Sequence, residues 1–199
     1  MELEKKNQLE IKFVRNNSMR NGERKIVQKI SDLLADICEE NKNEKNIISK
    51  PLKCFYSKNI PLISIKDYLE HIYKYTKMDS STIVIILIYI DRICNINKCK
   101  LSYYIIHKLI LAAMMLAIKY NEDEIYSLKF YAKIGGVSLA ELCNFEYYFL
   151  CLINYNLYIS EDLFNKYNDY ILSSDSDEDD SDNYNFDDDN DDEDNEETK

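Results

Sequence analysis

The sequence predicts an all-α protein, and three observations support this fold class. The chain has only three Gly and two Pro among 199 residues, so it has little of the turn chemistry that a multi-stranded sheet requires. Apolar residues recur at helical spacing in several segments. Ser or Asp residues that can cap a helix stand directly before several of these segments. Hydrophobic residues make up 46% of the chain, which is enough for a sizeable core in one globular domain.

The first predicted helix spans residues 23–40 and has an apolar stripe opposite a charged face. Its inward-facing residues are expected to be Ile26, Ile30, Leu33, Leu34 and Ile37. Pro51 and Pro61 interrupt the following stretch from Asn41 to Leu62, which predicts a loop. Ser64 can then cap a second helix that runs to about residue 78. The residues that this helix is expected to bury are Ile65, Leu69, Ile72 and Thr76.

A third helix begins at Asp79 or Ser80 and is apolar almost all round, which is typical of a helix at the centre of a bundle. Its many β-branched residues make a strand the alternative. The pattern continues through residues 91–93 at helical spacing, which favours the helix. A fourth helix is predicted over residues 103–119, with Ser102 as its cap and Lys119 in its last turn.

Three further segments complete the predicted bundle. A helix over residues 125–134 is expected to end at Gly135 and Gly136, because glycine readily adopts the conformation that stops a helix. Ser138 and Glu141 form a capping-box pattern that opens a helix over residues 139–153. The expected inward residues of this helix are Leu139, Leu142, Cys143, Phe149, Leu150 and Ile153. A last short helix begins at Ser160 and ends near Leu172.

Charge is unevenly distributed along the chain. The net charge is −11, but residues 173–199 alone carry −14, which leaves +3 for residues 1–172. The tail is nearly all Asp, Glu, Ser and Asn, so it cannot bury enough apolar surface to fold and is expected to be disordered. The rest of the chain lacks the excess of Lys and Arg that nucleic-acid binding requires, so we expect no nucleic-acid partner.

Membrane insertion and secretion are not expected either. The longest apolar runs, 83–90 and 109–118, are far shorter than the roughly 20 residues needed to cross a bilayer. The N-terminus alternates charges where a secretory signal has an apolar core, so we expect a cytoplasmic or nuclear protein with reduced cysteines. The cysteines lack the spacing of zinc or redox motifs and are interpreted as small core residues; they are Cys38, Cys54, Cys94, Cys99, Cys143 and Cys151.

The sequence offers little for catalysis. The two histidines, His71 and His107, are far apart in the sequence, and each lies on a predicted helix. The chain has no GxSxG, HExxH, P-loop or GxGxxG pattern. We therefore expect a protein that uses no metal or cofactor and is not an enzyme; the alternative is an enzyme that uses carboxylates alone.

One acidic residue stands out on the helix that opens with the capping box. Glu146 lies beside the apolar face, where an unpaired buried carboxylate would cost several kcal/mol. It is either a solvated residue at the edge of the stripe or the partner of a cation. Lys119 is the candidate cation because its helix is expected to lie alongside, although it could simply complement its own helix dipole. With Tyr120, Phe149 and Leu150, the pair would form an apolar surface carrying two opposite charges, which suits an interaction site.

The order of these motifs resembles the cyclin family, above all the P-type or U-type cyclins of plants and the phosphate-pathway cyclins of fungi. In this chain, ISIKDYLEHIYKYTKM resembles the first cyclin-box helix of the family. YIDRIC resembles the second helix, and AAMMLAIKYNED resembles the third. FYAKIGGVSLAEL resembles the segment that leads to the fifth helix, and NFEYYFLCLINYNL resembles the fifth helix itself. The resemblance covers residues 61–160 and implies a single cyclin box of five core helices with flanking N-terminal and C-terminal helices.

The resemblance also implies a function and its residues. Lys119 and Glu146 match the pair with which cyclins hold a cyclin-dependent kinase, and Tyr120, Phe149 and Leu150 are its neighbours. In such a complex the third and fifth cyclin helices press on the C helix of the kinase and favour its active arrangement. The cyclin supplies no catalytic group. The implied function is a regulatory subunit that binds and activates a cyclin-dependent kinase.

Five further residues are expected to have structural roles, namely Asp91, Arg92, His71, Gly135 and Gly136. Asp91 is expected to be buried and paired. Relatives usually carry Arg where this chain has His71, so the partner of an acid such as Asp91 or Glu70 is expected to differ, with some pH sensitivity.

The expected organisation has five parts. They are an N-terminal extension (1–22), a helix and linker (23–60), the cyclin box (61–160), a C-terminal helix (161–172) and the acidic tail (173–199). In the tail, Ser174 and Ser176 each precede an Asp by three residues, a pattern that acidophilic kinases phosphorylate. The tail either solubilises the chain or contacts a basic partner.

Two other function classes remain open. The cyclin fold could serve as an adaptor for a partner that is not a kinase, because a fold does not fix a function. Alternatively, the tail could make the chain an acidic, chaperone-like binding protein. Charge reversal at Lys119 or Glu146 should weaken binding only in the kinase hypothesis, whereas deletion of residues 173–199 should abolish the main interaction only in the chaperone hypothesis.

Overall fold

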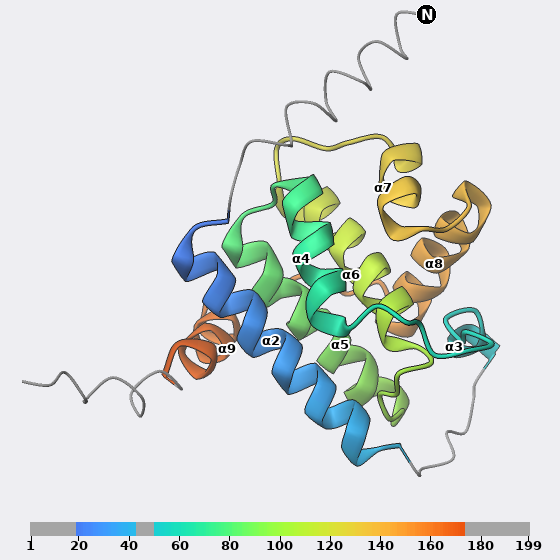
Figure 1. Cartoon of the computed structure of the whole chain (residues 1–199), viewed down its shortest axis with the longest axis horizontal. Coiled ribbons are helices and arrows are strands. Elements are labelled where there is room, and N and C mark those ends of the chain that lie inside the picture. The colour runs from blue at the N-terminus through green and yellow to red at the C-terminus, as the bar shows by residue number, and fades with distance from the viewer. Residues whose placement is uncertain (1–18, 43–49, 174–199) are drawn as a thin grey trace, which may run out of the picture.

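The computed structural model describes residues 19–42 and 50–173, and these ranges form a bundle of α-helices without a strand (Figure 1). In chain order the helices are α2 (Asn21–Glu40), α3 (Lys50–Lys53), α4 (Ile65–Thr76), α5 (Ser80–Asn97), α6 (Ile106–Asn121), α7 (Leu128–Gly135), α8 (Leu139–Leu152) and α9 (Glu161–Ser173). The predicted all-α fold class is confirmed. The predicted disorder of the tail and the phosphorylation of Ser174 and Ser176 concern residues outside the described ranges.

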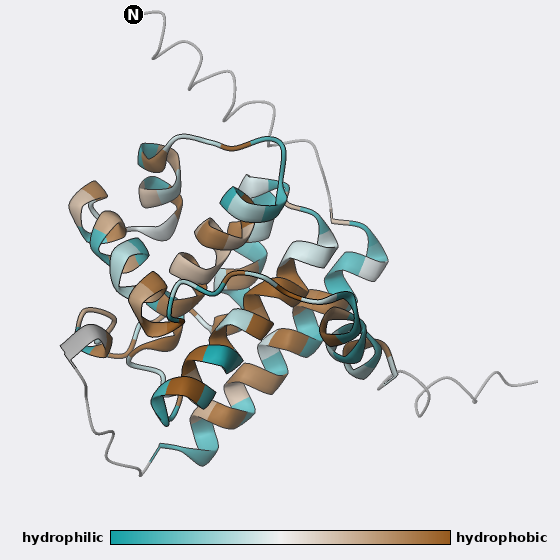
Figure 2. Ribbon diagram, turned by 180° about the vertical axis from the view of Figure 1, so that it is seen from behind, coloured by the Kyte–Doolittle hydropathy of each residue, from teal (hydrophilic) through white to brown (hydrophobic). Residues whose placement is uncertain are grey.

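Helices α5 and α6 form the centre of the bundle. They pack on each other, α2 and α9 cover α5, and α4, α7 and α8 surround α6. Within α6 every residue from Ile106 to Ile118 except Lys108 is buried. By length and composition α5 could cross a membrane, but ten of its side chains are buried inside this bundle. The apolar residues of both helices therefore serve the core, and brown segments gather at the middle of the molecule in Figure 2.

Helix starts that depend on local chemistry agree with the sequence. Ser64 Oγ accepts a hydrogen bond from the Asp67 amide at 3.0 Å and caps α4. At the start of α8, Ser138 Oγ accepts from the Glu141 amide at 3.2 Å, and the Glu141 carboxylate accepts from the Ser138 amide at 3.0 Å. This capping box is confirmed, and its hydrogen bond from the Ser138 amide lowers the pKa of Glu141.

Three predicted boundaries are wrong. Ser102 does not cap α6; its carbonyl oxygen accepts from the amides of Ile105 and Ile106, and the chain turns through residues 103–105 before the helix begins. The short helix α7 begins at Leu128 rather than at residue 125, because Ser127 caps it. The predicted loop between α2 and α4 contains the single turn α3.

The buried faces differ from the predicted ones on two helices. Helix α4 buries all four predicted residues. On α2, Ile26, Leu33 and Ile37 are only half-buried, because the helix turns a different stripe to the core; its buried residues are Val27, Ile30, Ser31, Leu34 and Cys38. On α8, Leu139 and Cys143 are exposed, so the interpretation of every cysteine as a core residue is wrong at Cys143.

Two glycines shape the turn between α7 and α8. Gly135 is the last residue of α7, and a Cβ at this position would lie 2.3 Å from Leu111 Cδ2 on the fully buried face of α6. Gly136 caps the helix with a φ of 66°, a left-handed conformation that costs glycine little. The structural roles expected at these positions are therefore close packing at Gly135 and backbone freedom at Gly136.

Arg92, Asp91 and His71 are the three remaining residues with expected structural roles, and each links its helix to another part of the fold. Arg92 donates to the carbonyl oxygens of Asn156 at 2.5 Å and Tyr158 at 3.1 Å, which fixes the chain just beyond α8. Asp91 is half-buried rather than buried, and it accepts from the hydroxyl of Tyr167 on α9 at 2.6 Å. His71 is bonded to neither acid considered as its partner: its Nε2 lies 3.2 Å from the carbonyl oxygen of Ile134.

Candidate functional site

An ion pair joins the end of α6 to the middle of α8. Lys119 Nζ donates to Glu146 Oε1 at 2.5 Å, although the two residues are 27 positions apart in the sequence. The side chains are 29% and 23% exposed, respectively, so each is shielded by the bundle yet open to a partner. The sequence interpretation of Glu146 as a residue paired with Lys119 is confirmed.

Contacts between α5 and α6 position Lys119. It lies in the last turn of α6, where its positive charge complements the helix dipole. Three residues later, the Glu122 carboxylate accepts a hydrogen bond from the Asp79 amide at 2.9 Å and another from the hydroxyl of Thr82. The end of α6 is thereby tied to the start of α5. Sequence reasoning did not assign this role to Glu122, whose partners are about 40 positions away.

Aromatic packing under α8 sets the orientation of Glu146. Leu142, Phe145 and Phe149 are buried on its inner face. The ring of Phe55, just after α3, stacks on Phe145 with centroids 5.4 Å apart and meets the edge of Phe149 at 6.3 Å. Because these rings fix the rotation of α8 about its axis, Glu146 is held at the border between the buried and exposed faces.

The predicted neighbours of the pair lie at different depths. Tyr120 is 52% exposed and Leu150 is half-buried, so both can contact a partner. Phe149 is fully buried, and a partner docked on this surface cannot touch it. Its place among the contact residues is therefore corrected: it supports the surface from below, because the apolar face of α8 includes it.

The outer face of α8 is unusually apolar for a surface helix. Tyr147, next to Glu146, is 58% exposed, and Leu139 is 39% exposed. Cys143 is also exposed, and Cys151 is half-buried beside the hydroxyl of Tyr155. Sequence reasoning missed Tyr147, although its position directly after Glu146 on the helix was a signal. Apolar side chains gathered on one exposed face are typical of a protein interaction site.

The site has the chemistry of a clasp for main-chain groups. The Lys119–Glu146 bond uses one of three ammonium protons and one of two carboxylate oxygens, so both groups retain bonding capacity for a partner. Electrostatic interaction with Cys151 raises the pKa of Tyr147. Among the described residues, no group of three or more His, Cys, Asp and Glu side chains could hold a metal ion.

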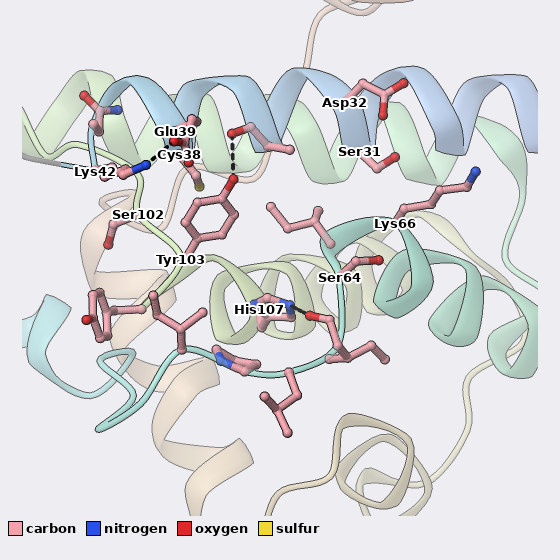
Figure 3. Close-up of a pocket in the computed structure, with 18 of the residues that line it drawn as sticks. Ser31, Asp32, Cys38, Glu39, Lys42, Ser64, Lys66, Ser102, Tyr103 and His107 are labelled. Carbon is pink, nitrogen blue, oxygen red and sulfur yellow. Dashed lines mark hydrogen bonds and ion pairs between the residues drawn. The ribbon is translucent and has the colours of Figure 1, made fainter.

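A separate pocket of about 880 Å³ lies near the other end of α6 (Figure 3). It lies between α2, the segment before α4 and the start of α6. His107 Nε2 lies 2.9 Å from the carbonyl oxygen of Ile63, and the hydroxyl of Tyr103 donates to the carbonyl oxygen of Ala35 at 3.3 Å. Burial lowers the pKa of His107, which favours its neutral form. This pocket is distinct from the Lys119–Glu146 surface.

The helical bundle agrees with comparisons to known proteins. The cyclin family model matches residues 22–157, and the chain belongs to the cyclin family. Cyclins are non-catalytic regulators of protein kinases. The matched range contains α4 to α8 with both residues of the ion pair.

The relatives are of the predicted kind. Cyclin-U2-1 of Arabidopsis thaliana is 36% identical over 116 residues, which cover 58% of this chain and 52% of the relative. Cyclin-U4-1 of the same plant is 29% identical over 150 residues, covering 74% of each chain. PHO85 cyclin-7 of Saccharomyces cerevisiae is 32% identical over 149 residues, covering 69% of this chain and 51% of the relative. The chain thus spans about half the length of two of these three relatives.

Proposed function

We propose that this protein is a regulatory subunit that binds and activates a cyclin-dependent kinase. The observation that carries the proposal is the Lys119–Glu146 pair, held at 2.5 Å on a surface that is otherwise apolar. The names of similar proteins support it, since one relative is a PHO85 cyclin and others are plant U-type cyclins. The proposal includes a kinase of the cyclin-dependent class, to which the chain itself contributes no catalytic group.

The clasp would act by binding one conformation of the kinase in preference to another. A kinase segment that lies across α6 and α8 can place a carbonyl oxygen against Lys119 and an amide against Glu146. Tyr120, Tyr147 and Leu150 supply the apolar contact around these polar bonds. Because the buried rings beneath α8 hold this surface rigid, the kinase segment adapts to it, and its active arrangement becomes the more populated one.

A pull-down from native lysate tests this function. The full chain should recover a cyclin-dependent kinase, identified by mass spectrometry, and Lys119→Glu should lose that kinase while keeping its helical circular dichroism. Lys42→Glu is the matched control, because Lys42 forms an ion pair of the same 2.5 Å length with Glu39 at the far end of α2. Equal kinase recovery by Lys119→Glu and wild type would contradict kinase binding at this surface, and recovery of a partner that is not a kinase would favour the adaptor function.

The cellular setting belongs to the same proposal. A kinase regulator of this class would work in the cytoplasm, the nucleus or both.

The acidic segment after α9, with its charge of −14, is proposed to solubilise the chain or to contact a basic partner. Deletion of residues 174–199 should therefore leave kinase recovery unchanged in the pull-down, and loss of the kinase would favour the chaperone-like alternative.

A further inference from the structure

Two cysteines lie together at the end of α5, away from the Lys119–Glu146 surface. Cys94 is in the last turn of α5, and Cys99 follows the cap residue Lys98, whose φ of 50° turns the chain back. Cys99 Sγ comes within 3.9 Å of the carbonyl oxygen of Ile93, the residue beside Cys94. Both cysteines line the same small cavity, so the turn at Lys98 brings the two side chains to one place in the fold. A five-residue spacing that matches no sequence motif therefore forms a dithiol pair in the fold.

Both thiols line a cavity of about 240 Å³. Side chains of α2, α5 and α9 form its walls, including Leu34, Leu87 and Tyr167. Cys94 and Cys99 are half-buried, so a molecule as small as hydrogen peroxide can reach them, whereas bulky reagents are hindered. The cavity thus gives the pair selective access to small oxidants.

The two thiols are not equivalent. Interaction with Cys94 lowers the pKa of Cys99, whereas interaction with Cys99, together with burial, raises the pKa of Cys94. Asp91, which also lines the cavity, raises the pKa of Cys94 further. Because the thiolate is the form that attacks a peroxide, Cys99 is the residue that reacts with the oxidant. Cys94 reacts second, with the oxidised Cys99.

We propose that Cys94 and Cys99 form a peroxide-sensitive pair that closes reversibly to an intramolecular disulfide. The Cys99 thiolate attacks hydrogen peroxide, the O–O bond breaks, and Cys99 becomes a sulfenic acid while hydroxide leaves and is protonated to water. The Cys94 sulfur then attacks the Cys99 sulfur, the S–S bond forms, and the sulfenic oxygen leaves as a second water. The two sulfurs together lose two electrons, and these reduce the peroxide.

The disulfide would tether the last turn of α5 to the segment that leads into α6. Two other cysteines are poorer candidates for this reaction. Cys38 is fully buried, and burial raises its pKa to about 12. Burial likewise raises the pKa of Cys54 to about 12. Cys143 is exposed on α8, so it is the thiol that would react first if exposure alone decided.

Peptide mapping of the full chain tests the proposal. The protein is treated with equimolar hydrogen peroxide, its free thiols are alkylated, and it is digested with trypsin. Because trypsin cleaves after Arg92, Lys98 and Lys100, the two cysteines fall in different peptides, ICNINK and CK. The expected product is these two peptides joined by a disulfide, with a mass about 2 Da below their sum. Dithiothreitol should separate them.

Three variants identify the order of events. Cys94→Ser should stop at a sulfenic acid on Cys99 that dimedone traps, and Cys99→Ser should leave Cys94 unreacted. Cys143→Ser should give the linked peptides in the same yield as the wild type. The proposal is overturned if the wild type yields no linked peptides, if Cys94 pairs with Cys38, or if Cys143 is oxidised before Cys99. The wild-type digest decides the question even where a serine variant fails to fold.

Discussion

Removal of one partner of the Lys119–Glu146 pair should weaken kinase binding strongly. In the free protein the two side chains are 29% and 23% exposed, so solvent still stabilises each charge when the other is removed. Docking of a kinase would exclude that solvent. Lys119→Ala or Glu146→Ala would then leave one buried charge unpaired, and this typically costs about 2 to 5 kcal/mol. The dissociation constant should rise between roughly 30-fold and several thousand-fold.

The double variant separates this effect from a general loss of contact. Removal of both charges leaves no unpaired group at the interface, so Lys119→Ala with Glu146→Ala should cost less than the sum of the single variants. The stability of the free protein should change by no more than about 1 kcal/mol, because the pair is partly exposed. Thermal unfolding of each variant checks that the fold is kept.

Isothermal titration of each variant into the purified kinase provides the assay. The matched control is Lys42→Ala, whose ion pair with Glu39 has the same 2.5 Å length but exposed fractions of 59% and 57%. This control should change the dissociation constant by less than about threefold, since surface pairs contribute little. The reasoning is refuted if Lys119→Ala binds as tightly as this control, or if the two single variants are simply additive.

Three further predictions concern stability. Gly135→Ala should lower the free energy of unfolding by about 1 to 3 kcal/mol in urea titrations, because its Cβ would lie 2.3 Å from Leu111. The control Gly22→Ala, where a Cβ would meet nothing within 4 Å, should leave the free energy of unfolding unchanged. Equal effects of the two substitutions would contradict this prediction. Tyr167→Phe should cost about 1 kcal/mol by removing a hydrogen bond to a half-buried carboxylate on α5, and an unchanged midpoint would count against it. Burial lowers the pKa of His107 below 6.5, so the free energy of unfolding should fall as the pH drops below 6.5. The decrease with falling pH should be smaller in His107→Gln. Parallel pH profiles of the variant and the wild type would disprove this prediction.

The features that the sequence predicted correctly depend on local chemistry. The Ser138–Glu141 capping box and the Ser64 cap require only residues within one helical turn, so their pattern was sufficient. The central position of α5 followed from its nearly uniform apolar composition. The Lys119–Glu146 pair joins two distant helices, and it was predicted because the resemblance to cyclins added to the expected packing of those helices.

The features that the sequence did not predict depend on contacts between distant segments. Tyr104 stacks on Tyr56 at 5.8 Å and the hydroxyl of Tyr103 bonds to α2, and these contacts accompany the turn that delays the start of α6. The helical pattern placed Phe149 on the inner face of α8, where it lies, whereas the resemblance to cyclins placed it at the interface, and its contact with Phe55 beneath α8 is not visible in the sequence. The buried face of α2 was also predicted wrongly, because α2 packs on three other helices and the sequence does not show how these helices surround it.

The rate of phosphate transfer by the purified kinase, measured against increasing concentrations of this protein, tests the central claim most directly. In the proposed function, the rigid surface around Lys119 and Glu146 both binds a cyclin-dependent kinase and switches it on. The rate should rise and saturate with the wild-type chain, and the half-saturating concentration of Glu146→Ala should rise by the same factor as its dissociation constant. A kinase that binds the wild-type chain tightly without any increase in rate would contradict the account.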